Sequence, residues 1–453
     1  MTKNLTVGNP AILILSFAAP LFIGNLFQQC YNMADTIIVG RTIGVDALAA
    51  VGCTGSINFL ILGFVMGFTQ GAGILTSQRF GAGDVPGIRR SFAASILLGA
   101  GLTLLMMLIS ILFARPLLRF LRTPPEILEA AYSYIVVIYW GIAAAVLFNL
   151  CSNIMRAVGD SRTPLIFLVI ACIINIILDF VFILVFHTGV AGAAYATVIA
   201  QLLAGILCIP VIRKKMPILC ITREDWKAIT ATELLTHLKV ALPMGFQMSI
   251  IALGVITVQF ALNQLGISAV AAFTASQKID QFATMPMASF GAAMTTYAAQ
   301  NYGAQKIDRI RKGLIQCSLI SCSFSILMGI LYFFAGDHFA AIFIGNEPET
   351  ISLAHTYLRI NGCFYLFLAC LFIFRQTLQG LGDSLVPTIA GLMELVMRTF
   401  AAIILAAHFG FVGICFAGPL AYIGACIPLS AAIVLTTKKL LRKQRRTSSR
   451  STM

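Results

Sequence analysis

Four acidic side chains lie within long apolar stretches of this 453-residue sequence, where a charge is unexpected: Asp35, Asp179, Asp280 and Glu394. If these stretches cross a membrane, each ionised side chain costs roughly 2.5–3.5 kcal/mol on insertion scales. Carboxyl groups in such places usually bind a cation, accept a proton or pair with a base. The four acids are therefore the first candidates for chemistry.

Asp35 ends a stripe of polar residues. Gln28, Tyr31 and Asn32 precede it by seven, four and three positions, which places all four on one face of a helix. This face offers oxygen ligands for a cation and a carboxylate that can accept a proton, so we predict a cation site. The alternative is a structural hydrogen-bond cluster that holds helices together.

Asp179 has Asn175 one helical turn before it, so a carboxylate and an amide oxygen share a face. Oxygen ligands of this kind suit Na⁺, and a buried aspartate that can be protonated suits H⁺. Asp179 and Asn175 could bind either ion, so the sequence leaves open whether the coupling ion is Na⁺ or H⁺. Alternatively, Asp179 lies solvated near the outer end of its helix.

The other two acids have less obvious roles. Asp280 follows Lys278 by two positions, so the two do not face each other on a helix, and Asp280 is either a substrate contact or structural. Glu394 and Arg398 are one turn apart. We expect them to form an internal ion pair that neutralises both charges and helps to position the C-terminal half.

Further polar and methionine side chains are candidates for a substrate pocket. Asn149 and Asn153 share a helical face and either line a cavity or bond to a neighbouring helix. Methionine adapts to ligands of varied shape, although methionine clusters more often serve plain packing. The predicted substrate-binding set comprises six residues: Gln28, Asn149, Asn153, Met248, Met285 and Asp280.

No catalytic or cofactor-binding motif accompanies these residues. The sequence has no HExxH, GxSxG or Walker loop, its twelve cysteines form no CxxC pair, and its five histidines are isolated. We expect no enzyme, no cofactor and no metal other than Na⁺ at the cation site. Any active transport must then be driven by an ion gradient or a partner ATPase.

The composition excludes a soluble enzyme or binding module. Hydrophobic residues make up 59% of the chain and charged residues only 11%, and the mean hydropathy is +0.93. The net charge of +14 comes from bases in loops and in the C-terminal tail, so we expect no nucleic-acid partner. The chain is predicted to be an all-α integral membrane protein.

Twelve apolar stretches are long enough to span a bilayer. They cover about 12–39, 46–75, 91–113, 128–155, 163–186, 190–212, 238–263, 267–297, 313–335, 354–379, 386–408 and 412–436. Of the 31 Lys and Arg residues, 23 lie in the termini and in the loops after even-numbered spans. By the positive-inside rule both termini are cytoplasmic in a bacterial plasma membrane. We expect a monomer in contact with lipid.

The chain also contains an internal duplication. Pro20 recurs as Pro243, Tyr134 as Tyr357, and the Gly-Asp-Ser at 159–161 recurs at 382–384, with offsets of 221–223 residues. This predicts two six-helix lobes related by a pseudo-two-fold axis along the membrane normal, with the substrate between them. The predicted boundaries are an N-terminal lobe at 1–212, a cytoplasmic linker at 213–237, a C-terminal lobe at 238–437 and a basic cytoplasmic tail at 438–453.

Several short motifs together resemble the multidrug and toxic compound extrusion (MATE) family over essentially the whole chain. They are Tyr-Asn-Met-Ala-Asp-Thr at 31–36, the Gln-to-Gly segment 78–83, Met-Arg-Ala-Val-Gly-Asp at 155–160, Asn-Ile-Ile-Leu-Asp at 175–179 and Gly-Val-Ala-Gly-Ala-Ala at 189–194. The resemblance is strongest to the branch of the DNA-damage-inducible bacterial members. It implies two six-helix lobes that exchange Na⁺ or H⁺ for organic, often cationic, compounds.

The resemblance also implies roles for particular residues. The family's cation site in the N-terminal lobe would comprise Asp35, Tyr31, Asp179, Asn175 and Thr197, with Gln28 nearby. In that branch protonation is linked to a bend of the first helix, and Pro20 provides a weak point for one. A second branch carries acids on the seventh and tenth helices. Here the corresponding stretches, 245–260 and 364–374, contain none.

We therefore predict a secondary antiporter that exports organic, often cationic and amphipathic compounds in exchange for H⁺ or Na⁺ by alternating access. A lipid-linked oligosaccharide flippase of the same superfamily is the alternative, although only two bases, Lys278 and Arg398, lie well within spans to form the basic cavity it would need. Less favoured readings are a passive channel, a structural membrane subunit and a membrane-embedded aspartyl hydrolase.

Overall fold

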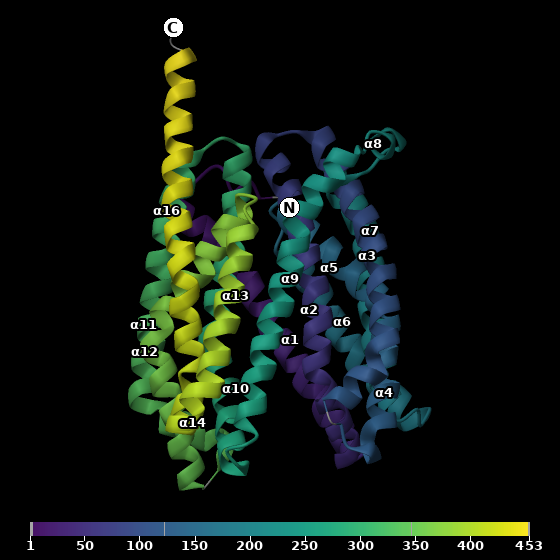
Figure 1. Ribbon diagram of the computed structural model, residues 1–453. Helices are drawn as coiled ribbons and strands as arrows, with labels where there is room; N and C mark the ends of the chain where they lie inside the picture. Colours follow the sequence, from purple (N-terminus) through teal and green to yellow (C-terminus); the bar gives the residue numbers. More distant parts are fainter. Residues whose placement is uncertain (1–2, 122, 346, 452–453) are drawn as a thin grey trace. The chain divides into compact units, whose positions relative to one another are not determined.

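The computed structural model describes residues 3–121, 123–345 and 347–451, those from 445 on as backbone only. The described residues are nearly all α-helical and contain no β-strand (Figure 1). The chain divides into two compact units, which we treat separately. Unit 1 holds 20–249 and the described residues before Leu5, and unit 2 holds Leu5–Ala19 and the chain from Ile250 onward.

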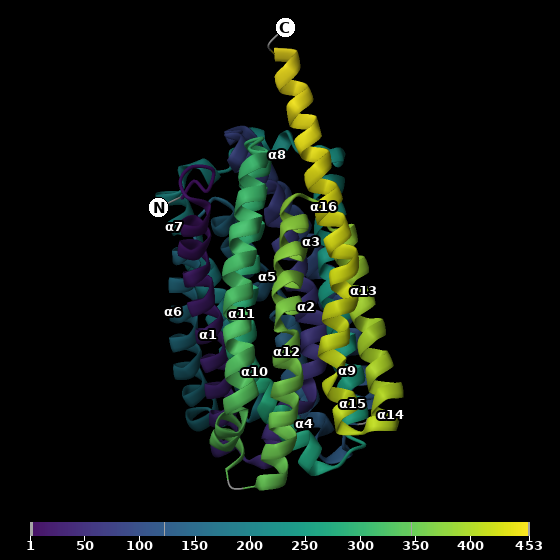
Figure 2. The same cartoon turned by 90° about the vertical axis from the view of Figure 1, so that its left-hand side faces the viewer.

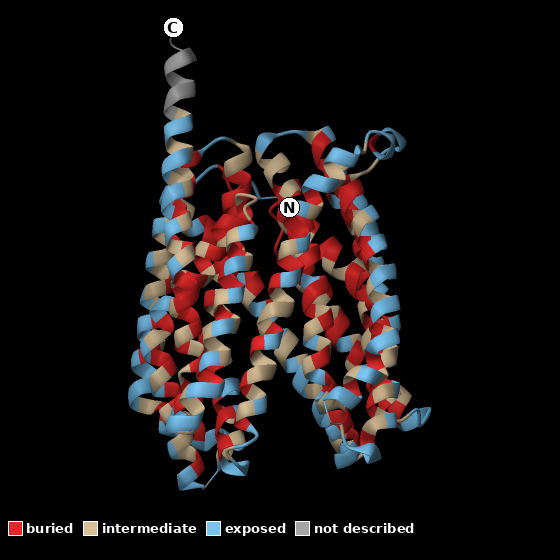
Figure 3. Cartoon of the chain, viewed as in Figure 1, coloured by how far each residue is buried: buried red, intermediate tan, exposed pale blue. Residues whose placement is uncertain are grey.

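Unit 1 is a bundle of long helices that pack through small and apolar side chains. Its buried residues lie on the inward sides of the helices, whereas the outward sides are exposed (Figure 3). Its elements are α1 (Pro10–Thr42) from Pro20 onward, α2 (Val45–Ala82), α3 (Val85–Phe120), α4 (Pro125–Trp140), α5 (Ile142–Ala157), α6 (Arg162–Phe180), α7 (Val190–Lys215), the short α8 (Arg223–Lys227) and α9 (Ala231–Leu262) as far as Ser249.

Unit 2 repeats this architecture. Here α11 and α12 lie side by side along most of their length (Figure 2), and α16 continues beyond the helices it packs against. Its elements are the first part of α1, α9 from Ile250, α10 (Ile267–Gly303), α11 (Ile307–Ile344), α12 (Pro348–Gly380), α13 (Leu385–Phe400), α14 (Ala406–Phe409), α15 (Phe411–Cys415) and α16 (Ala417–Ser451).

Each of the twelve predicted spans coincides with one or more of these helices. Among the described residues, ten helical segments are long and apolar enough to cross a membrane, and α4 with α5 makes an eleventh that is bent by 47°. The twelfth is α10, which is long enough at 37 residues but more polar, because it carries Gln277, Lys278, Asp280 and Gln281. The polar residues of α10 are thus the main departure from a uniform membrane helix.

Glycine and aspartate set the helix ends at the predicted loops. Gly83 ends α2 with a left-handed φ of 73°, and the Asp84 side chain caps α3 by accepting a hydrogen bond from the Gly87 backbone at 2.9 Å. Gly159 repeats this role with a φ of 88°, and Asp160 then accepts from the Arg162 backbone at 2.9 Å. The repeated Gly-Asp-Ser motif is therefore a structural turn.

Both units contain a π-helical turn at corresponding places. Val181–Val185 follows α6 two residues after Asp179, and Ala401–Leu405 follows α13 three residues after Arg398. π-Turns are rare and occur frequently at functional sites. Their recurrence with an offset of 220 residues, close to that of the sequence repeat, supports the duplication. The two turns also indicate that the regions around Asp179 and Arg398 are candidates for functional sites.

The contact-based units differ in extent from the domain boundaries predicted at 212 and 238. The first part of α1 packs with unit 2, and α9 packs with unit 1 as far as Ser249. The predicted linker at 213–237 contains α8, and α9 already begins within it, at Ala231. The basic tail continues α16 as far as Ser451, and its last two residues, 452–453, lie outside the described residues.

Candidate functional site

Unit 1 encloses a cavity of about 420 Å³ between α1, α2, α4, α5, α6 and α7. The whole polar stripe of α1 lines it, as the helical spacing predicted: Gln28, Tyr31, Asn32 and Asp35. Asn149 of α5 and Thr197 of α7 join them in the wall. Residues from three helices that are distant in sequence are therefore gathered around one polar space.

Two acids that lie within membrane helices of unit 1 meet beside this cavity, and one of them, Asp35, lines it. Asp35 on α1 and Asp179 near the end of α6 are both buried, and their carboxyl groups lie within hydrogen-bonding reach of each other. Two carboxylates repel unless a proton or another cation lies between them. One oxygen of each group, Oδ1, is buried and has no hydrogen-bond partner among the described residues. The pair can therefore share a proton or contribute ligands to a cation.

Three neutral side chains form a hydrogen-bonded chain that reaches this pair through Asn175. The Tyr31 hydroxyl donates to the Thr197 hydroxyl oxygen at 3.0 Å. In the amide orientation that gives both its atoms a partner, Asn175 donates to Asp179 Oδ2 and accepts from the Thr197 backbone N–H, each at 3.2 Å. The five residues that the family resemblance grouped as a cation site thus form one connected cluster.

Other residues of the cavity were not predicted. Tyr134 of α4 is buried close to both acids, and Asn58 of α2, Arg156 of α5 and Gln201 of α7 also line the space. Tyr134 had a signal in the sequence, because it recurs as Tyr357 in the duplication. The spacing of polar residues along the sequence did not indicate Asn58, Arg156 or Gln201. Whether such a side chain faces a cavity depends on how its helix is rotated about its own axis, and the packing of the bundle sets that rotation.

The predicted substrate residues are not gathered at one place. Gln28 and Asn149 line the unit 1 cavity, although the Asn149 amide also donates to the Ala145 carbonyl at 2.8 Å. Asn153 instead donates to Thr69 of α2 at 3.4 Å. Met248 packs on α2, and a Cβ built at Gly67 would lie 2.9 Å from its Cγ. Met285 of α10, like Met248, lines neither this cavity nor the unit 2 pocket described next.

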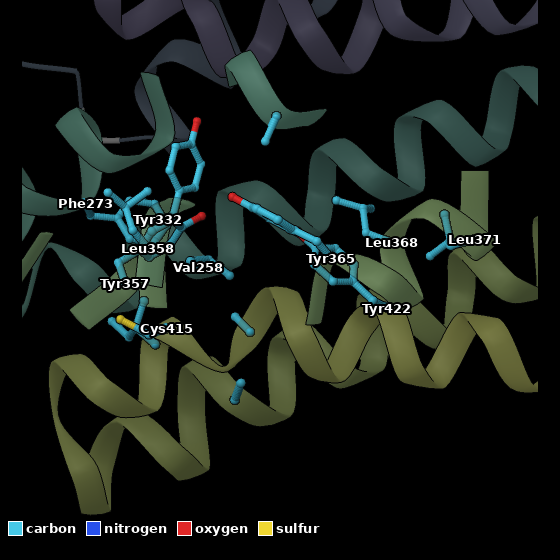
Figure 4. Close-up of a cluster of buried hydrophobic side chains, with 14 of the residues drawn as sticks. Val258, Phe273, Tyr332, Tyr357, Leu358, Tyr365, Leu368, Leu371, Cys415 and Tyr422 are labelled. Atoms are coloured by element: carbon cyan, nitrogen blue, oxygen red, sulfur yellow. The ribbon is translucent and has the colours of Figure 1, made fainter. Parts of the chain in front are cut away.

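Unit 2 contains a smaller polar pocket, of about 190 Å³, around Asp280. The Asp280 carboxylate accepts a hydrogen bond from the Tyr365 hydroxyl, and it forms no ion pair with Lys278. Tyr365 belongs to the buried aromatic cluster that Figure 4 shows, together with Tyr357 and Tyr422. The repeat aligns Asp280 with Asn58, 222 positions earlier. Related positions thus line a cavity in both units.

The predicted pairing of Glu394 with Arg398 is wrong. Glu394 of α13 forms a buried ion pair with Arg375 of α12, and Arg398 takes no part in it. Both partners are more than nine-tenths buried. The reason is geometric: Arg375 reaches Glu394 from a different helix, α12, whereas the arginine one turn further along α13 does not approach it. Glu394 is structural in this arrangement.

Pro20, predicted as the bend of the first helix, lies within a continuous α1. It is the residue at which the helix passes from unit 2 to unit 1. Proline leaves the carbonyl one turn earlier without its helical hydrogen bond, so this position is mechanically weak. Whether α1 bends here during function stays a prediction.

Comparison with known proteins identifies the architecture. A family model described as MatE matches the chain twice, at residues 20–181 and 243–404, one match for each half of the duplication. The chain belongs to the MatE family. It is 30% identical over 384 residues to the probable multidrug resistance protein YpnP of Bacillus subtilis, covering 84% of this chain and 85% of that protein. It is 27% identical to the probable multidrug resistance protein YoeA of the same organism, covering 82% of each.

A solved structure supports the fold. An outward-facing multidrug resistance MATE family transporter of the MOP superfamily aligns with a TM-score of 0.89 and 22% identity, covering 97% of this chain and 99% of that one. The predicted fold class, an all-α membrane protein of twelve helices in two lobes, is confirmed. Members of the MatE family are transporters, so the chain is a multi-pass membrane transporter and not an enzyme.

Proposed function

We propose that this MatE family member is a secondary antiporter that exports organic, often cationic and amphipathic, compounds in exchange for H⁺ or Na⁺. The observation that carries the proposal is the contact between Asp179 and Asp35, which lines the unit 1 cavity. An incoming cation neutralises the pair, the cavity rearranges, and bound substrate leaves. The relatives named as probable multidrug resistance proteins support this choice of substrate class.

The geometry of the pair favours H⁺ as the coupling ion. A hydrogen bond between two carboxyl groups requires that one of them carry a proton. The surrounding donors and acceptors, Tyr31, Thr197 and Asn175, already have partners in one another. A proton needs only the shared position between the carboxyl groups, whereas Na⁺ would require several of these oxygens to reorient towards it.

The cavity has a size suited to a small organic molecule. Its volume of about 420 Å³ falls within the range of roughly 300–1,000 Å³ typical of small-molecule pockets. Apolar and polar side chains line it in about equal number, which suits amphipathic cations. The lipid-linked oligosaccharide flippase is not favoured, because the relatives are named for multidrug resistance and Arg156 is the one base in the lining of this cavity, which also includes Asp35.

The test is transport by purified protein in proteoliposomes. Efflux of a fluorescent organic cation is measured under an imposed proton gradient and, separately, under an imposed sodium gradient. We expect the proton gradient to drive efflux. Asp35→Asn and Asp179→Asn should each lower it by about 5–150-fold, the range of typical coupling free energies. The matched control is Asp46→Asn, which removes an exposed acid at the start of α2 and should transport normally.

The outcomes separate the parts of the proposal. Efflux driven only by sodium would keep antiport and overturn the preference for H⁺. Normal efflux by folded Asp35→Asn and Asp179→Asn proteins would refute the assigned cation site. Equal efflux with and without either gradient would indicate a passive channel.

A further inference from the structure

The unit 2 pocket contains a base that no acid neutralises directly. Because Glu394 pairs with Arg375, the Arg398 guanidinium forms no ion pair among the described residues. Its Nε is buried and has no hydrogen-bond partner there. Arg398 is half-buried, and an N–H donor that is left unpaired away from water, as its Nε is, is costly. An unpaired arginine in a membrane protein pocket therefore points to a ligand.

The surroundings direct Arg398 into the pocket. Its side chain lies over Gly254 of α9, where a Cβ would come within 2.9 Å of the arginine Cδ, so α9 passes close by at a residue with no side chain. Gln259, Gln277 and Gln281 supply further polar groups to the lining, and Tyr357 and Tyr422 lie near the guanidinium. Figure 4 shows these two tyrosines within the buried aromatic cluster. The pocket thus has a polar lining, and an apolar aromatic cluster packs next to it.

The size and charge of the pocket limit what it can bind. About 190 Å³ is below the usual range for a whole drug-sized molecule, so the pocket accommodates one group of a larger ligand. Planar guanidinium donors match the oxygens of carboxylate and phosphate groups. Asp280 is occupied by Tyr365 and is not in ion-pair contact with Arg398, so the pocket presents a positive and a negative group separately.

We propose that the unit 2 pocket is an anion subsite, in which Arg398 binds a carboxylate or phosphate group of the transported organic compound. The substrates of this transporter then include zwitterionic amphiphiles in addition to simple organic cations. The inference rests on the proposed export function and assigns it a substrate feature. It concerns a different unit and different residues from the cation pair Asp35 and Asp179.

The test compares dyes that differ only in the anionic group. Tetramethylrhodamine and its methyl ester share one cationic ring system, and only the free acid carries a carboxylate. Binding is measured by fluorescence anisotropy to the full-length protein in phosphatidylcholine nanodiscs. We expect the wild type to bind the acid about tenfold tighter than the ester, as a charge-assisted hydrogen bond allows. Riboflavin and its 5′-phosphate form a second pair that reports on phosphate.

Variants assign any preference to the guanidinium. Arg398→Gln should abolish the preference for the acid while leaving ester binding unchanged, and Arg398→Lys should retain part of it. The matched control is Lys278→Gln, which removes an exposed base from α10 outside the pocket lining and should keep the full preference. Unchanged ester binding also shows that a variant is folded. If Arg398→Gln does not fold, the ratio of the wild-type affinities for the acid and for the ester still decides whether an anion subsite exists.

The contradicting results are distinct. Equal binding of acid and ester, and of riboflavin and its phosphate, by the wild type would overturn the anion subsite while leaving the exporter intact. An acid preference that survives Arg398→Gln would overturn the assignment to this residue. If phosphatidylglycerol nanodiscs abolish the preference, the anion is a lipid headgroup and the substrate inference is wrong. Absence of binding by every dye would instead count against the proposed function itself.

Discussion

At the scale of single residues, the acids in the membrane have different partners and therefore different roles. Asp35 and Asp179 contact each other, Asp280 contacts a tyrosine, and Glu394 contacts Arg375. Only the first arrangement brings two like charges together, so only there does adding a cation relieve repulsion. The Glu394 pair is already neutral, and it holds α13 against α12. The proposed coupling is therefore placed in unit 1.

The Glu394 pair should matter for stability. Glu394→Gln leaves the Arg375 charge buried without a counterion, and removing one partner of a buried pair costs about 3–5 kcal/mol. We expect a clearly lower thermal unfolding temperature for the purified protein in detergent. Arg398→Gln is the matched comparison, because it removes a base one turn away that forms no ion pair, and it should unfold near the wild-type temperature. An equal fall in unfolding temperature for both variants would instead support the pairing of Glu394 with Arg398.

At the scale of helices, small residues decide how closely the elements of unit 1 approach one another. Gly141 lies at the 47° bend between α4 and α5, and a Cβ there would collide with Val198 of α7. The absence of a side chain lets the bent pair pack on α7. Thr197, one residue before Val198, accepts a hydrogen bond from Tyr31 and belongs to the proposed cation site. The bend therefore contributes to the position of the site.

A substitution at the bend should show this dependence. Gly141→Ala adds a methyl group where a β-branched side chain cannot easily move away, and such overpacking typically costs 1–3 kcal/mol. We expect a lower unfolding temperature, and Val198→Ala in the same chain should restore part of the loss because it removes the colliding methyl groups. A double-mutant cycle on unfolding measures the coupling. Additive effects of the two changes would mean that the predicted collision does not limit packing here.

At the scale of the whole molecule, the number of membrane crossings depends on α10. Without it the described helices provide eleven crossings, counting α4 and α5 as one, and the two termini would lie on opposite sides of the membrane. With it there are twelve, and the termini share a side. The distribution of 23 of the 31 bases predicts that this side is the cytoplasm. The polar residues of α10 are tolerated in a crossing because Asp280 is bonded within unit 2.

Reporter fusions test this crossing number directly. Green fluorescent protein and alkaline phosphatase, attached in turn to each terminus of the intact chain, are active in the cytoplasm and outside it, respectively. We expect fluorescence and no phosphatase activity at both termini. A phosphatase-active C-terminus with a fluorescent N-terminus would show that α10, or another of the twelve helices, does not cross.

The sequence by itself was sufficient for the membrane spans, the duplication and the shared face of the α1 stripe. Hydropathy over about twenty residues indicates a membrane span, because a single helix must match the bilayer. Repeated motifs show a duplication, and spacings of three and four predict which side chains share a helical face. The stripe from Gln28 to Asp35 does line one cavity for this reason.

The tertiary structure decided which partner each buried polar group has. Asp35 meets Asp179 and Asp280 meets Tyr365 across helices that are 144 and 85 positions apart, and Glu394 prefers Arg375 to the arginine one turn away. Such contacts depend on the rotation and depth of each helix in its bundle, which the packing of many apolar side chains sets together. Spacing along one helix contains no information about its neighbours, so the unpaired state of Arg398 became visible only in the folded unit.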